Sequence, residues 1–160
     1  MSGIRLILLL YPTWDKEKTM SMDVVPHLNF RGEARMALEF YQTVFGGNLA
    51  IVTYEDLGNV QEPGDAKLVM WGQVAADSGF KVMAFDATAQ LPFEKGQNAF
   101  YVAVRFDTNE EAKTSWEKLT SGGSVRRELG PAPWAPMYGM LQDKFGVVWV
   151  LDVVPQDNAS

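Results

Sequence analysis

The sequence contains no cysteine and only one histidine, His27, among its 160 residues. The absence of cysteine excludes a disulfide framework, a thiolate metal site, an iron–sulfur cluster and a cysteine nucleophile. It also suits a reducing compartment, so we expect a cytoplasmic protein. One histidine cannot form a zinc site of two or three histidines within one chain. A Ser-His-Asp triad would depend on His27, and the G-x-S-x-G turn of many serine hydrolases is absent.

Positive charge and long apolar runs are also scarce. Lys and Arg number 14 against 20 Asp and Glu, a formal net charge of -6. Such a surface repels phosphate backbones, so we expect no nucleic-acid partner. The apolar run Leu6–Tyr11 is far below the roughly 18 residues of a membrane span, so we expect no membrane partner. Residues 1–22 are interpreted as an N-terminal extension whose apolar run could contact a partner surface.

The composition is otherwise that of a globular protein rich in large apolar side chains. Apolar residues make up 47% of the chain, and there are five Trp and eight Met. These side chains either form the core or line a pocket for an apolar or planar molecule. The length suits one compact domain or two small modules.

The order of predicted elements repeats. In the first half, a strand over residues 24–30 precedes a helix over 33–45, which ends at Gly46-Gly47. Strands are expected over 49–54, 67–75 and 81–85, with an acidic loop over 55–65 that we interpret as solvated surface.

The second half has the same order. A strand over 99–106 is followed by the capping box Thr108-x-x-Glu111 and a helix that stops at Gly122-Gly123. Strands over 124–129, 138–142 and 147–154 complete it. The sequence therefore predicts an α+β fold of two βαβββ modules, residues 23–87 and 97–155, within one domain 23–155 and before a tail 156–160. Their curved mixed sheets would form a cup with the helices outside.

Two stretches carry a family resemblance. Residues 26–30, 37–41 and 44–47 at the beginning, and 138–149 at the end, resemble PhnB-like proteins of the glyoxalase/bleomycin resistance/dioxygenase (vicinal oxygen chelate) superfamily. Some relatives carry a demethylubiquinone-methyltransferase-like label. The resemblance implies a glyoxalase-like fold, a small-molecule ligand in the cup and a homodimer. In active members it also implies a divalent metal that chelates two substrate oxygens.

The positions that would hold this metal are poorly filled. His27 matches the first-strand ligand, whereas relatives often have His at the place of Trp71 and Glu at the place of Gln73. The fifth-strand position falls near Ala99 or Tyr101, and the last-strand carboxylate falls on Val150. We therefore expect no metal centre and no cofactor.

Six side chains are candidates for the ligand site that the resemblance implies. His27, Trp71, Gln73 and Tyr101 would line the cup, and Trp134 and Tyr138 would form its rim. Ordinary packing is the alternative for each. Three prolines between residues 131 and 136 predict a rigid loop around Trp134. Arg126-Arg127 is read as exposed strand, with contact to an anionic group as the alternative.

The leading interpretation is a metal-free binding protein for a small, partly apolar or aromatic molecule, with a sequestering role of the bleomycin resistance type. The main alternative is a metal-dependent lyase, isomerase or ring-cleaving dioxygenase that uses His27, Gln73 and either Asp152 or Glu94. A third interpretation is a protein-interaction module whose cup is filled by Trp71 and Tyr101. A methyltransferase has little support, because no glycine-rich loop follows the first strand.

Overall fold

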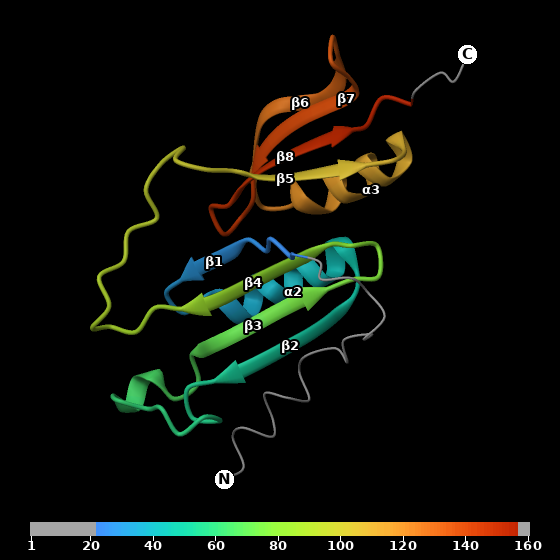
Figure 1. Cartoon of the computed structure of the whole chain (residues 1–160). Helices are drawn as coiled ribbons and strands as arrows, with labels where there is room; N and C mark the ends of the chain where they lie inside the picture. Colours follow the sequence, from blue (N-terminus) through green and yellow to red (C-terminus); the bar gives the residue numbers. More distant parts are fainter. Residues whose placement is uncertain (1–21, 157–160) are drawn as a thin grey trace. The chain divides into compact units, whose positions relative to one another are not determined.

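The computed structural model describes residues 22–156. The predicted N-terminal extension lies outside the described residues, apart from Met22, and so does most of the predicted tail. The chain divides into two compact units, one up to Glu94 and the other from Lys95. Within residues 22–156, each unit holds one sheet and one α-helix (Figure 1). No helix within the described residues is long and apolar enough to cross a membrane.

The described part of the first unit is a four-stranded mixed sheet with one α-helix and one short 3-10 helix. Its elements are β1 (His27–Phe30), α2 (Ala34–Phe45), β2 (Asn48–Thr53), the short 3-10 helix η1 (Pro63–Asp65), β3 (Val69–Ala75) and β4 (Lys81–Asp86). The strands lie in the order β1-β4-β3-β2. β1 and β4 are parallel, and the other neighbours are antiparallel.

The second unit repeats this topology. Its elements are β5 (Val102–Phe106), α3 (Asn109–Leu119), β6 (Ser124–Ala132), β7 (Ala135–Gln142) and β8 (Val148–Val153). The strands lie in the order β5-β8-β7-β6, again with one parallel pair, β5 and β8. The predicted α+β fold of two βαβββ modules is confirmed.

Each core lies between the helix and one face of its sheet. In the first unit α2 buries an apolar stripe of Ala34, Ala37, Leu38, Tyr41 and Val44, spaced as on one face of an amphipathic helix. Gly72 on β3 makes room for this packing, because a Cβ there would lie 2.3 Å from Leu38 Cδ1. In the second unit Gly139 on β7 does the same for Trp116 of α3, at 2.8 Å.

The segment around Trp134 differs from the prediction. A rigid loop is expected there, but β6 continues to Ala132, β7 begins at Ala135, and only two residues connect them. Prolines are disfavoured inside sheets because they lack a donor N–H. Pro131 lies on the outer strand β6, and Pro136 precedes Tyr138, where β7 begins to pair with β8. Neither proline therefore removes a hydrogen bond between β7 and β8.

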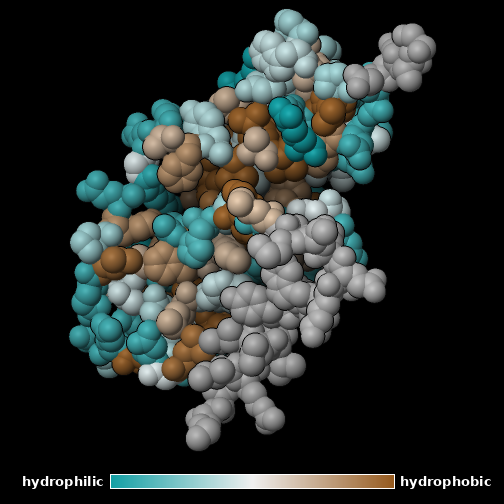
Figure 2. Space-filling view, viewed as in Figure 1, coloured by the Kyte–Doolittle hydropathy of each residue, from teal (hydrophilic) through white to brown (hydrophobic). Residues whose placement is uncertain are grey.

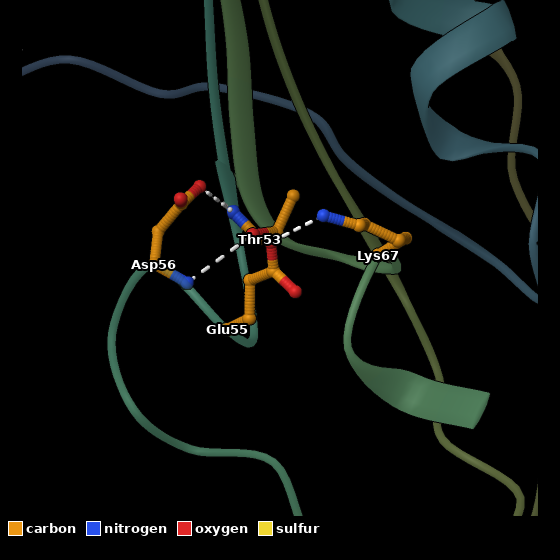
Figure 3. A network of polar contacts seen from close by, with 4 residues as sticks. All are labelled: Thr53, Glu55, Asp56 and Lys67. Carbon is orange, nitrogen blue, oxygen red and sulfur yellow. Dashed lines mark hydrogen bonds and ion pairs between the residues drawn. The ribbon is translucent and has the colours of Figure 1, made fainter. Parts of the chain in front are cut away.

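The acidic loop after β2 is more ordered than its composition suggests. The Thr53 backbone N–H donates to Asp56 Oδ2 at 2.9 Å, and the Asp56 N–H donates to Thr53 Oγ1 at 3.2 Å. Lys67 forms an ion pair with Glu55 beside this turn (Figure 3). Asp65 contradicts the expectation of solvated surface, since it is buried at 4% exposure. Its Oδ2 atom is buried without a hydrogen-bond partner among the described residues.

Candidate functional site

Three of the predicted site residues lie on one face of the first sheet. Because Gly72 faces α2, its neighbours Trp71 and Gln73 face away from the helix. Cross-strand register places Gln73 beside Met83, and Met83 beside His27. An imidazole, a thioether and an amide thus form a row across β1, β4 and β3.

His27 is exposed and has two neighbours on this face. Its Nδ1 lies 2.9 Å from Asn29 Oδ1, within hydrogen-bond distance. Its ring centroid lies 5.5 Å from that of Phe85. This surrounding is polar on one side and aromatic on the other, which suits contact with a planar molecule.

The donor set does not fit the divalent metal that the resemblance implies. Among the described residues, no group of three or more His, Asp or Glu side chains could hold a metal ion. Beside His27 in the row stands Met83, and Gln73 offers only a neutral amide oxygen. Divalent cations of this kind prefer imidazole and carboxylate ligands, so we derive no reaction step through a metal.

The second sheet also has a face away from its helix. Because Gly139 faces α3, Tyr138 and Met140 point to the opposite face. There Tyr138 pairs with Asp152 and Met140 pairs with Val150. Hydrophobic residues gather over the strands of this unit, with hydrophilic residues around them (Figure 2).

Trp134 and Tyr138, predicted as a rim, contact each other. Their rings meet edge to face with centroids 5.3 Å apart. The Arg127 guanidinium lies 5.0 Å from the Tyr138 ring centroid and 5.3 Å from that of Trp134. Trp134 keeps 55% of its surface exposed. An indole held by two neighbours and still half exposed is available to a ligand.

Tyr101 lies just before β5 and belongs to a second polar cluster. Its hydroxyl donates to Asn98 Oδ1 at 2.9 Å. Arg126 donates to the same Asn98 oxygen at 2.8 Å and to Gln142 Oε1 at 3.0 Å. The guanidinium carbon also lies 5.9 Å from the Tyr101 ring centroid. Tyr101 was expected inside a strand, but β5 begins one residue later, at Val102.

Asp152 is the one carboxylate of β8. One oxygen lies 3.4 Å from Arg105 Nε, and the other, Oδ1, is buried without a hydrogen-bond partner. Asp152 shares the face of Tyr138 through the register of β7 and β8. Val150, at the position of the family's last-strand ligand, is apolar and lies beside Met140.

The structure brings some of the predicted residues together and adds others. His27 and Gln73 share one row, Trp134 and Tyr138 form a contact pair, and Tyr101 stands with Arg126. Sequence reasoning missed Asn98, Gln142 and Arg105, which complete the polar contacts of the second unit. No local pattern marks them, because each contact joins residues from different strands or from a loop and a strand.

The pKa of Tyr54, outside these faces, is raised above its ordinary value. Burial is the main cause, and the charges of Asp65 and Asp86 add to it. The hydroxyl donates to the Asp86 carbonyl oxygen at 2.9 Å. Tyr54 is therefore a neutral donor that stabilises the first unit.

Comparisons with known proteins agree with this fold. The family model described as 3-demethylubiquinone-9 3-methyltransferase matches residues 22–152. The solved structure of protein PA1353 from Pseudomonas aeruginosa is similar with 33% identity and a TM-score of 0.74, over 85% of this chain and 100% of that one. Protein YjdN from Escherichia coli (strain K12) is 26% identical, over 84% of this chain and 97% of its own.

Two further solved structures share this fold. A putative 3-demethylubiquinone-9 3-methyltransferase, PhnB protein, from Bacillus cereus is similar with 26% identity and a TM-score of 0.64, over 83% of this chain and 100% of that one. A glyoxylase/bleomycin resistance protein/dioxygenase domain from Frankia sp. EAN1pec shares the fold at 10% identity and a TM-score of 0.59, over 86% and 100%. The chain therefore belongs to the PhnB-like family that the 3-demethylubiquinone-9 3-methyltransferase model describes, and it has the glyoxalase-like fold.

Proposed function

We propose that this protein binds a small, partly apolar or aromatic molecule without a tightly bound metal. The observation that carries the proposal is the contact pair of Trp134 and Tyr138 beside Arg127, on the face of the second sheet away from α3. Large aromatic side chains left half exposed on a sheet face are typical of binding surfaces. The ligand-binding residues of the proposal are His27, Trp71, Gln73, Tyr101, Trp134 and Tyr138.

Polar groups within each unit would orient a ligand there. Gln73 and His27 offer an amide and an imidazole in the first unit, and the Tyr101 hydroxyl is fixed by Asn98 in the second. A few polar groups among apolar ones are what small-molecule sites use for orientation. Such a protein could sequester its ligand in the cytoplasm, a role of the bleomycin resistance type that needs shape and stacking but no reaction.

Elemental analysis tests the metal-free part of this proposal. Protein purified without a tag and without chelators would be exposed to Ni²⁺, Zn²⁺, Mn²⁺ and Fe²⁺, desalted and analysed. We expect far less than one metal ion per chain, because imidazole and amide alone form a weak site. Retention of one metal per chain, lost in His27→Ala, would contradict the proposal.

A metal-dependent enzyme is the second candidate, and one observation favours it. Asp152 Oδ1 is a buried carboxylate oxygen without a hydrogen-bond partner. Such an atom can coordinate a cation. Its other oxygen already faces Arg105. If Asp152 is a ligand, Asp152→Asn will abolish the metal retention measured above, whereas Glu94→Gln will test the other acid considered for this role.

We also propose that the protein is a homodimer. The outer strands of the sheets, β1 and β2 in the first unit and β5 and β6 in the second, each leave one edge unpaired within the described residues, and unpaired edges favour association. Light scattering after size exclusion, at micromolar concentration, should give twice the mass of the chain. A strict monomer would contradict this proposal and leave ligand binding to be judged alone.

A further inference from the structure

Two neighbouring arginines on β6 break the alternation of a strand. In a regular strand, Arg126 and Arg127 would point to opposite faces. The register of β6 and β7 is irregular at this point: Val125 pairs with Leu141, and Arg127 pairs with the next residue, Met140. Arg126 is therefore the extra residue of a β-bulge, a feature that re-aims side chains.

The bulge brings both guanidinium groups to the face away from α3. Arg127 shares that face with Met140 through the register. Arg126 reaches the side chain of Gln142, which alternates with the buried Leu141 and so lies on the same face as Met140. The two adjacent positive charges therefore stand on the face that also carries Tyr138.

Both guanidinium groups lie against aromatic rings. Arg126 lies over Tyr101, and Arg127 lies over Tyr138 and Trp134. A guanidinium stacked on a ring keeps its N–H groups in its own plane, directed outward from the stack. Two nitrogens of Arg126 donate hydrogen bonds to the neutral side-chain oxygens of Asn98 and Gln142. Arg127 has no side-chain acceptor among the described residues.

Neither charge is neutralised by a carboxylate. Within residues 22–156 neither Arg126 nor Arg127 forms an ion pair, whereas Arg105 pairs with Asp152. Arg105 is therefore a useful contrast, because it lies on the same sheet and its charge is compensated. In a chain of net charge -6, two adjacent uncompensated cations beside aromatic rings form a local anion site.

We propose that this face binds a planar aromatic anion, a carboxylate, sulfonate or phosphate ester on an aromatic ring system. The acid group accepts hydrogen bonds from the outward N–H edge of Arg127, with Arg126 beside it. The ring system packs on the exposed part of Trp134. This inference rests on the proposed small-molecule function and specifies the charge of its ligand.

Two probes of equal shape test the assignment on the full chain. 2-Naphthoate carries the acid, and 2-naphthamide is its neutral counterpart. Isothermal titration should show 2-naphthoate binding at least tenfold more tightly. Arg127→Gln should weaken 2-naphthoate at least tenfold and change 2-naphthamide less than threefold, and Arg127→Lys should recover only part of the loss because the planar fork is missing.

Matched controls separate local recognition from general electrostatics. Arg35→Gln makes the same change of charge at an exposed position of α2 and should leave both affinities unchanged. Unaltered circular dichroism and melting temperature would show that each variant is folded. An equal loss of 2-naphthoate affinity in Arg35→Gln and Arg127→Gln would overturn the inference, because net charge alone would then explain the binding.

The remaining outcomes distinguish this inference from the proposed function. If both probes bind equally and Arg127→Gln changes neither, the protein binds aromatic molecules but the anion assignment is wrong. If neither probe binds at millimolar concentration, the anion assignment is wrong, and aromatic binding at Trp134 fails with it. Tight binding of 2-naphthoate that survives Arg127→Gln but not Trp134→Ala would place the ring as proposed and overturn the role of the arginine.

Discussion

The two units share one topology but hold the beginnings of their helices in different ways. Helix α2 has no side-chain cap at Glu33. Instead Asp86, the last residue of β4, accepts the N–H groups of Gly32 at 2.7 Å and Ala34 at 3.0 Å. Helix α3 is capped locally, since Thr108 Oγ1 accepts the Glu111 N–H at 3.3 Å. In the first unit the carboxylate of Asp86, distant in sequence, therefore joins the helix to the sheet. In the second unit the hydroxyl of Thr108, next to the helix in sequence, caps it.

The sheet faces away from the helices differ as well. The first unit presents His27, Met83 and Gln73 in a row, without an arginine or carboxylate among them. The second unit presents Arg126 and Arg127 over aromatic rings, with Arg105 paired to Asp152. A repeat of topology is therefore not a repeat of chemistry, and the second face has the stronger capacity to recognise charge.

Replacing Asp86 by Ala is expected to have the largest effect on stability. Asp86 is 2% exposed, and its Oδ2 also accepts the Val69 N–H at 2.9 Å. The substitution leaves three backbone donors without their acceptor, so the free energy of unfolding should fall by about 4 kcal/mol. Denaturant unfolding measures it, with Asp77→Ala in an exposed turn as the control. Similar losses in both variants would show that Asp86 does not join helix to sheet.

Glycines after the two helices offer a matched test of the repeat. A Cβ at Gly47 would lie 2.4 Å from the Ala75 carbonyl oxygen, and one at Gly123 would lie 2.3 Å from that of Gln142. Each Ala substitution should cost about 2 kcal/mol through overpacking. Gly47→Ala should cost about 1 kcal/mol more, because its φ of 95° is left-handed. Gly64→Ala, with open space around it, is the control; equal stability of all three variants would contradict the close approach.

Removing the local cap should have a smaller effect. Thr108→Ala deletes the acceptor of the Glu111 N–H, and the free energy of unfolding should fall by about 1 kcal/mol. Thr108→Ser keeps the acceptor and should retain most of the stability. Thermal unfolding of the unaltered protein and of the two variants measures these differences in stability. A loss as large as that of Asp86→Ala would mean that the two helices are held equally strongly at their beginnings.

The smallest expected effect concerns pH. Hydrogen bonding from the Thr53 backbone N–H lowers the pKa of Asp56 below its ordinary value of 3.8. A lowered pKa in the folded state means that this contribution is present above the ordinary pKa and is lost as the pH falls through the lowered one. A carboxyl-carbon NMR titration of Asp56 should give a midpoint below 3.8, and Thr53→Ala should raise it. An unchanged midpoint in that variant would remove only the Thr53 hydroxyl from the explanation, because alanine keeps the backbone N–H. A midpoint at or above 3.8 in the unaltered protein would contradict the lowered pKa.

Local patterns predicted most of the fold. The Thr108 cap, the extent of α2 and the glycine pair that ends it each depend on neighbours in sequence, and these lie where they were expected. Helix α3 ends earlier than expected, at Leu119 instead of at Gly122-Gly123. The acceptor role of Asp86 could not be predicted in this way, because its partner Gly32 lies 54 residues away.

The candidate site was predictable only in part. Trp134 and Tyr138 stand out as large aromatic residues near prolines, and the structure shows them in contact. The shared face of Arg126 and Arg127 depends on a bulge, and a one-residue change of register is invisible in a sequence without its partner strand. The same limit hid the contacts of Asn98 and Gln142.

Titration of chelator-treated protein with 2-naphthoate, followed through the indole signals of an NMR spectrum, tests the central claim most directly. We predict saturable binding that shifts the Trp134 signal, is unchanged when divalent metals are added back, and is lost in Trp134→Ala. Binding that appears only after one metal per chain has been restored would contradict a metal-free binding protein and favour the enzyme.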